Sequence, residues 1–215
     1  MRTASFVVNN YPFFLCSYLN ILDPLNSLKR NGLFLYLEKI MLTNPNVKYN
    51  FSWDDLGDIA LGRPNLGATT SVSVYRLMQY TLRDVLEKYC GADETNLLFI
   101  KAGYKAGTEF CKNQLDCSLI FEDFLAHLVD QMEQLGIGLL RVEKADMDNM
   151  SFIFTVSEDL DCSGLPYSGV PNCDYDEGFI AGIMKVYTGK DFLVREIDCW
   201  CTGERTCRFT VDLKK

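Results

Sequence analysis

The sequence has no run of basic residues, and its formal net charge is -8 at pH 7. A protein that binds nucleic acid needs a basic surface to neutralise phosphate groups, so this composition argues against that class. The acidic balance by itself names no substrate.

Long apolar runs are also missing. The N-terminal stretch MRTASFVVNNYPFFLCSYLNILDP is apolar in patches, but Asn9, Asn10 and Pro12 interrupt it. It lacks the continuous apolar segment of a secretory signal and the roughly 20 apolar residues that a membrane span needs. We therefore expect a cytoplasmic protein without a membrane span.

Histidine is scarce, because His127 is the only one in the chain. The sequence has no Gly-x-Gly-x-x-Gly after a strand, no P-loop and no His-Glu-x-x-His motif. A Ser/His/Asp triad would have to use His127, which has no recognisable partners. The sequence favours a protein that is not an enzyme, and catalysis stays open as the alternative.

Cysteine, by contrast, is abundant, since the chain carries nine. A reducing cytosol discourages disulfides, and an odd number leaves at least one thiol unpaired within a monomer. A free cysteine is most often a small buried hydrophobic residue. That interpretation is adopted for Cys16, Cys90, Cys111, Cys117 and Cys162.

The chain is long enough for one sizeable domain with an extension. Residues 1–64 are predicted to form a helical N-terminal extension that packs on the domain, because Leu33, Leu37 and Ile40 recur at helical spacing. Residues 65–215 are predicted to form the domain itself, without internal repeats.

Three helices are expected in the first half of the domain, near residues 70–89, 94–112 and 119–135. In the second of them, Gly103 and Gly107 lie four residues apart, a spacing that permits close approach of a neighbouring helix. The first carries an apolar stripe that consists of Val74, Leu77, Met78, Leu82, Val85 and Leu86.

The hydrophobic period then changes from helical to alternating. GIGLLRVEKAD and SFIFTVSED predict two strands joined by a turn, and DFLVREIDCW and TCRFTVDL predict a second hairpin. A helix from about Cys173 to Thr188 separates the two hairpins. This order predicts an α+β fold, in which helices cover an antiparallel sheet made of two hairpins.

The second hairpin contains the stretch EIDCWCTGERTCRF, which suits either a buried hairpin or a metal site. Strand alternation allows Cys199 and Cys207 to meet across the hairpin. Glu196 lies three residues before Cys199, on the opposite face of a regular strand. Both can touch one ion only if the strand kinks or bulges near residues 197–199.

A tetrahedral zinc site takes four donors, and Cys173 is the fourth candidate beside Glu196, Cys199 and Cys207. Its place at a helix N-terminus favours a thiolate. Arginines nearby are candidates to offset the negative charge of the ligands. They are Arg195, Arg205 and Arg208. On spacing alone, the metal site and a buried hairpin with an exposed, ion-paired glutamate are equally good interpretations.

The pattern Cys173-x4-Gly178-Phe179-x2-Gly182, followed by Glu196-x2-Cys199-x7-Cys207-Arg208-Phe209, resembles the 4-vinyl-reductase (4VR) domain, also called the predicted hydrocarbon-binding domain. It is similar above all to the sensory domain of transcription activators that respond to phenol or xylene. The resemblance covers about residues 65–213 and excludes Cys201. It implies a structural zinc ion held by Cys173, Glu196, Cys199 and Cys207.

The resemblance also implies a buried apolar pocket for a small aromatic ligand. The candidate pocket residues are His127, Phe152, Phe154, Tyr175 and Trp200. A histidine beside an apolar helix stripe is more often a hydrogen-bonded structural residue, and aromatics on strands are more often plain core. The pocket and core interpretations both stay open.

Three functions are then compatible with the sequence. The first is a regulatory or sensor module that binds a hydrophobic or aromatic molecule and carries a structural zinc site. The second is an accessory subunit or enzyme of tetrapyrrole vinyl reduction. The third is a scaffolding or dimeric interaction protein, because the resemblance extends to vesicle-tethering subunits. A homodimer is expected in each case, no nucleic acid is expected to bind this chain alone, and thiolates suit iron as well as zinc.

Overall fold

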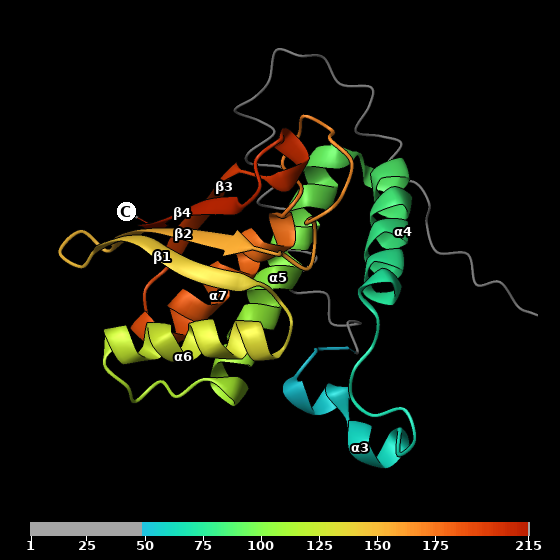
Figure 1. Ribbon diagram of the computed structural model, residues 1–215, viewed down its shortest axis with the longest axis horizontal. Helices are drawn as coiled ribbons and strands as arrows, with labels where there is room; N and C mark the ends of the chain where they lie inside the picture. The colour runs from blue at the N-terminus through green and yellow to red at the C-terminus, as the bar shows by residue number, and fades with distance from the viewer. Residues whose placement is uncertain (1–48, 215) are drawn as a thin grey trace, which may run out of the picture. The chain divides into compact units, whose positions relative to one another are not determined.

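The computed structural model describes residues 49–214, in which one compact unit begins at Ser52 (Figure 1). The predicted extension, residues 1–64, lies outside the described residues up to position 48. Its described part contains a 3-10 helix, η2 (Trp53–Leu56), and one helical turn, α3 (Ile59–Gly62). The packing of the extension on the domain stays a prediction.

Three long helices follow where the apolar periodicity predicts them: α4 (Val72–Cys90), α5 (Ala92–Gln114) and α6 (Phe121–Gln134). Gly91 alone separates α4 from α5, and its φ of 85° is a left-handed conformation that glycine adopts without strain. One residue thus ends the first helix and allows the second to start in a new direction. No described helix is both long and apolar enough to cross a membrane.

The sheet consists of the two predicted hairpins. Strands β1 (Leu139–Asp146) and β2 (Ser151–Ser157) form the first, and β3 (Phe192–Asp198) and β4 (Cys207–Leu213) form the second. Helix α7 (Asp174–Thr188) lies between them in the sequence. The strand order is β1-β2-β4-β3 and every pairing is antiparallel, which confirms the α+β fold.

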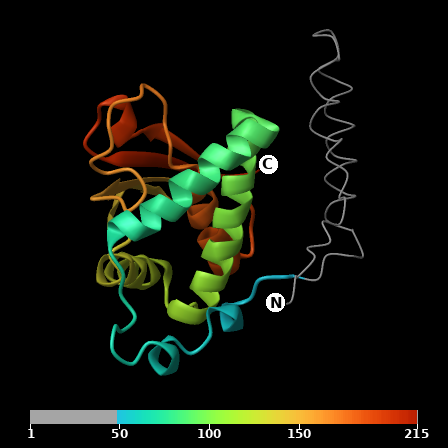
Figure 2. The same ribbon diagram turned by 90° about the vertical axis from the view of Figure 1, so that its right-hand side faces the viewer.

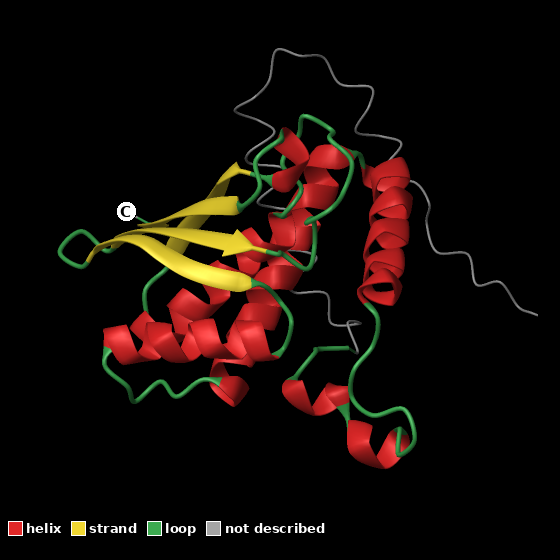
Figure 3. Cartoon of the chain, viewed as in Figure 1, coloured by secondary structure: helices red, strands yellow, loops and turns green. Residues whose placement is uncertain are grey.

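Alternate residues of the two central strands turn toward the helices and form the centre of the core. Phe152 and Phe154 of β2 are 0% and 1% exposed, and their register partners on β4 are the buried Val211 and Phe209. Helices α6 and α7 cover this face of the sheet (Figures 1 and 3). The ring of Phe121, at the start of α6, lies 5.2 Å from that of Phe152 between centroids.

Helices α5 and α7 touch through their backbones. A Cβ atom added at Gly103 or Gly107 of α5 would fall on a carbonyl oxygen of α7, and the same holds in reverse for Gly178 and Gly182 of α7. Two pairs of glycines, each four residues apart, therefore face each other, and the close approach predicted for α5 is confirmed.

Helix α4 packs on the domain by its polar side. Gln79 and Arg83 are buried, whereas Leu77 and Met78 of the predicted apolar stripe are 67% and 63% exposed. An amphipathic helix ordinarily turns its apolar stripe toward the core. In α4 the stripe is present, but it faces away from the core.

We expect Gly107→Ala to lower the free energy of unfolding by about 3 kcal/mol, because the new methyl group meets the rigid backbone of Phe179 rather than a movable side chain. Urea denaturation followed by circular dichroism measures the change. The matched control is Gly62→Ala, where nothing lies within 4 Å of the added Cβ. An equal effect at both positions would contradict the backbone contact.

Candidate metal centre

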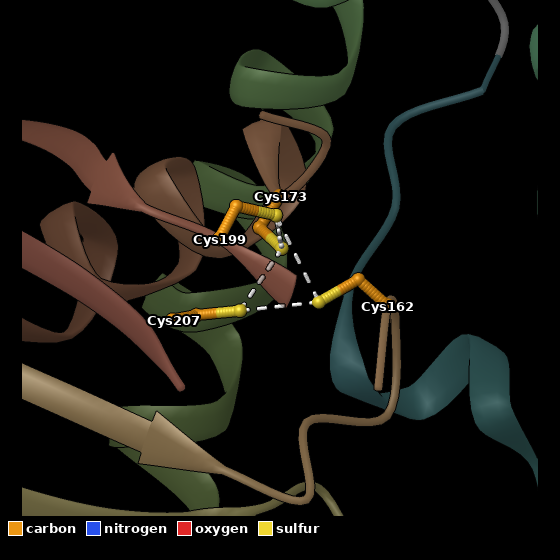
Figure 4. A group of neighbouring side chains, drawn as sticks. All are labelled: Cys162, Cys173, Cys199 and Cys207. Atoms are coloured by element: carbon orange, nitrogen blue, oxygen red, sulfur yellow. Dashed lines mark hydrogen bonds between the residues drawn. The ribbon is translucent and has the colours of Figure 1, made fainter. Parts of the chain in front are cut away.

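Four buried cysteine side chains from separate segments converge beside the second hairpin (Figure 4). Cys162 lies in the loop after β2, Cys173 precedes α7 as its N-cap, and Cys207 begins β4. Cys199 follows β3 and precedes a short 3-10 helix, η3 (Trp200–Thr202). All four are 0% exposed, and none of the described cysteines forms a disulfide.

The distances between the sulfur atoms match a mononuclear site. Sγ of Cys207 lies 3.1 Å from that of Cys162 and 3.6 Å from that of Cys173. Sγ of Cys199 lies 3.9 Å from that of Cys173 and 4.0 Å from that of Cys162. Zinc–thiolate bonds of about 2.3 Å place the sulfurs of a tetrahedron about 3.8 Å apart. An iron–sulfur cluster sets several iron ions between its cysteines and holds them further apart, so the geometry fits a single ion.

The four thiols also bias one another's ionisation. Hydrogen bonds from Cys162, Cys173 and Cys207 lower the pKa of the Cys199 thiol well below its ordinary value. The same contacts, that with Cys162 first, raise the pKa of Cys173. Cys199 is therefore the thiol that ionises first, and a thiolate is the form that binds a metal.

The predicted irregularity in β3 is present. The pairing of β3 with β4 shifts between Glu196 and Asp198, so Ile197 is the extra residue of a bulge. The bulge changes the strand's alternation just before Cys199. Glu196 and Cys199 consequently both approach Cys173, as the metal interpretation required.

Cys162 is the member of the cluster that the sequence interpretation missed. Its loop is held by Asp159, whose Oδ1 accepts the backbone N–H groups of Asp161 at 2.8 Å and Cys162 at 3.0 Å. From α4, Arg76 donates to the carbonyl oxygens of Leu160 at 2.8 Å and of Ser163. No spacing motif connects this loop with the second hairpin, so only the fold brings Cys162 to the other thiols.

Glu196 lies at the edge of the cluster as a fifth candidate donor. Its Oε2 accepts the Cys173 N–H at 3.1 Å, and its Oε1 is buried without a hydrogen-bond partner among the described residues. Burial, followed by the negative charge of Cys199, raises the pKa of Glu196 to about 8. Glu177 holds the Glu196 backbone, because its Oε1 accepts the Glu196 N–H at 2.8 Å.

Buried carboxyl groups surround the thiols on the side of α4. Asp159 and Asp176 lie within 4.8 Å of Cys173 through their ligand atoms. Burial raises the pKa of Asp159 to about 6, and burial together with Asp159 raises that of Asp176. Among the described residues, the buried side-chain nitrogen and oxygen atoms without a partner are all acceptors: Gln79 Oε1, Asp176 Oδ2 and Glu196 Oε1. A neighbourhood with unpaired acceptors and no unpaired donor favours a bound cation.

The three arginines expected near the ligands have other partners. Arg195 pairs with Glu177 at 2.6 Å, and Arg208 pairs with Glu143 at 2.9 Å. Arg205 is exposed. The expectation that they adjoin the thiolates was wrong, because carboxylates closer to the surface take up Arg195 and Arg208. Arg195 still acts indirectly, since it orients the Glu177 that holds Glu196.

The five candidate pocket residues do not gather in one place. Phe152 and Phe154 lie in the packed core, Tyr175 stacks on Phe179, and His127 Nδ1 accepts the backbone N–H of Asp116 at 3.3 Å. Trp200 lines an open recess of about 540 Å³ beside the Cys162 loop. The other lining residues include Val72, Arg76, Leu160 and Arg205. A ligand-binding role for the five residues stays a prediction.

Comparisons with known proteins match this architecture. The family model of the vinyl-4-reductase (4VR) domain matches residues 152–213, which contain all four cysteines of the cluster. An uncharacterized protein of Methanocaldococcus jannaschii is 30% identical over 148 residues, which is 69% of this chain and 81% of that protein.

Solved structures share the fold at low sequence identity. The phenol-responsive sensory domain of the transcription activator PoxR, solved with phenol, is 18% identical with a TM-score of 0.55, over 68% of this chain and 76% of that one. A vinyl-4-reductase family protein from M. jannaschii is 14% identical with a TM-score of 0.52, over 78% and 100%. Subunit 3 of a trafficking protein particle complex from Naegleria fowleri, covalently bound to palmitic acid, is 15% identical with a TM-score of 0.52, over 67% and 95%.

The polar contact between α4 and the Cys162 loop gives a testable prediction. Tyr75 Oη donates to Asp161 Oδ1 at 2.7 Å, and Gln79 Nε2 donates to Asp161 Oδ2 at 2.7 Å. We expect Tyr75→Phe to lower the free energy of unfolding by about 1–3 kcal/mol, because it leaves a buried carboxyl oxygen unsatisfied. The matched control is Tyr167→Phe, at an exposed tyrosine. Equal urea midpoints for the two variants would contradict the role of this contact.

Proposed function

The chain belongs to the vinyl-4-reductase (4VR) domain family, and from this premise we propose that it is a regulatory module of the sensor type, which binds a small hydrophobic or aromatic molecule and is braced by a structural zinc ion. The observation that carries the proposal is the convergence of four buried thiols from the loop after β2, the start of α7 and both strands of the second hairpin. One ion held there would cross-link three segments that the sequence separates.

The donor chemistry supports a structural rather than a catalytic ion. A tetrahedral site closed by four protein ligands has no open position for water or substrate. Zinc has no redox chemistry of its own, and it suits a buried all-thiolate site. The ion would supply folding energy, because the ligands are not assembled in the unfolded chain. The protein's own part is to exclude water and to hold the thiolates at the distances of one tetrahedron.

We assign the four positions to Cys162, Cys173, Cys199 and Cys207, since their sulfurs already stand 3.1 to 4.0 Å apart in four of their pairs. Glu196 then has the role of positioning Cys173 through its backbone N–H. The set with Glu196 in place of Cys162 is the competing assignment. Both sets share three cysteines, so one experiment on the two remaining donors separates them.

The recess beside the Cys162 loop is the proposed ligand site. Its walls combine the indole of Trp200 with Val72 and Leu160, and Arg205 offers a charge at the rim. Two proteins of the same fold carry apolar molecules: phenol in one and palmitic acid in the other. A ligand in this recess would contact the loop that carries Cys162, and so would act on the braced part of the domain. The module is proposed to work in the cytoplasm as a homodimer.

We expect the protein, purified without a metal-binding tag, to contain about one zinc ion per chain. After replacement of zinc by Co²⁺, the near-ultraviolet charge-transfer absorption counts the thiolate ligands. Cys162→Ala should lower this absorption by about a quarter, because one of four thiolates is lost. Glu196→Gln should leave it unchanged.

The control for this experiment is Cys117→Ala, which removes an exposed cysteine outside the cluster. If Glu196 is the fourth ligand, Cys162→Ala leaves the absorption unchanged and Glu196→Gln alters the cobalt spectrum. Protein that holds no metal under non-oxidising conditions would overturn the zinc brace altogether.

We expect phenol, as a probe, to bind in the recess and to be measurable by isothermal titration calorimetry. Trp200→Ala should weaken binding at least tenfold, since the indole supplies the largest apolar surface there. The matched control is Trp53→Ala, at a tryptophan that does not line this recess. Equal weakening by both variants, or binding that survives Trp200→Ala, would place the ligand elsewhere.

A further inference from the structure

One side of α4 exposes a continuous apolar surface. The large apolar residues on it are between 46% and 67% exposed. Their spacing of three and four residues places them on a single side of the helix. Together with Thr81 they are here named the α4 stripe: Val74, Leu77, Met78, Thr81, Leu82 and Val85.

Polar contacts on the opposite side fix the stripe in its outward direction. Tyr75 near the start of α4 is bonded to Asp161, and Arg83 in its second half forms an ion pair with Asp174 at 2.8 Å. The helix would have to break both contacts to turn its stripe inward. In Figure 2, α4 lies in front of α5 and the sheet, so this side is the outer side of the described unit.

The stripe requires no polar partner. Its hydroxyl group, that of Thr81, donates to the carbonyl oxygen of Leu77 in the same helix at 2.6 Å. Lys88, near the end of α4, is already paired with Asp84 at 2.6 Å. An occupant therefore gains by covering apolar surface and has no unpaired charge on the stripe to neutralise.

The side chains along the stripe are arranged symmetrically about its midpoint. The mirror positions are Val74 with Val85, Leu77 with Leu82, and Met78 with Thr81. A two-fold axis through the midpoint of an antiparallel helix pair brings each residue opposite its mirror position in the other copy. Valine then faces valine, leucine faces leucine, and the long methionine faces the short threonine. The stripe is thus complementary to itself.

We propose that two copies of this chain associate through the α4 stripe, antiparallel about a two-fold axis near Met78 and Thr81. A second copy fits better than an unrelated partner, because one isologous contact covers the exposed stripe of both molecules at once. Each copy contributes five large apolar side chains, which gives ten at the centre of the interface. Stable interfaces bury about 800 Å² per partner around such an apolar centre. Helix α4, about 28 Å long, provides the required extent.

The first test measures the mass of the full chain in solution by light scattering and sedimentation over a range of concentrations. The unmodified chain is expected to be a dimer. The variant Leu77→Glu with Met78→Glu should raise the dissociation constant at least 100-fold, because each copy would bury two charges against apolar side chains. The matched control is Ile120→Glu, a residue 65% exposed outside α4, which should leave the dimer intact.

The second test identifies the occupant directly. A photo-reactive benzoylphenylalanine at position 78 of the full chain should produce a covalent dimer whose cross-link maps to α4 of the other copy. Two results would overturn the proposal: a cross-link within one chain to residues 1–48, or a chain that stays monomeric at all concentrations. A dimer that survives the double glutamate variant would equally exclude the stripe as the interface. The metal content of each variant, measured alongside, shows whether the domain itself remains folded.

Discussion

The backbone contact between α5 and α7 determines how the rest of the domain is placed. Gly103 and Gly107 face Gly178 and Gly182 so closely that no side chain fits between the two helices. This contact fixes the direction of α7, and with it the position of Cys173 at its first turn. The sheet packs on the other side of α7 and brings the second hairpin to the same point. The thiol cluster depends on a helix pair that carries none of its chemistry.

Most of the fold could be predicted because its signals are local. The helices from Val72 to Gln134 follow from apolar residues at helical spacing, and both hairpins follow from alternation. Even the bulge at Glu196 to Asp198 was a geometric requirement of placing Glu196 and Cys199 near one ion. Such features depend on neighbours along the chain, which are visible in the sequence.

The features that could not be predicted depend on residues far apart in the sequence. Cys162 joins Cys207 across 45 positions, and only the loop geometry set by Asp159 and Arg76 brings it there. The outward stripe of α4 was hidden for the same reason. Periodicity identifies an apolar side, but it does not show that the buried carboxyl group of Asp161 attracts the polar side instead. Likewise, Phe152 and Phe154 carry the same pattern whether they line a pocket or fill a core.

Helix α4 has a position between two equilibria. Its inner side is bonded to the segment that carries Cys162, and its outer side carries the stripe on which a second copy is proposed to pack. If the cluster's occupancy alters how firmly this helix is held, it alters self-association by a fixed factor. Thermodynamic reciprocity then requires self-association to alter metal affinity by the same factor. Metal supply and protein concentration would act on one shared balance, and the assembled fraction of the protein would respond to both.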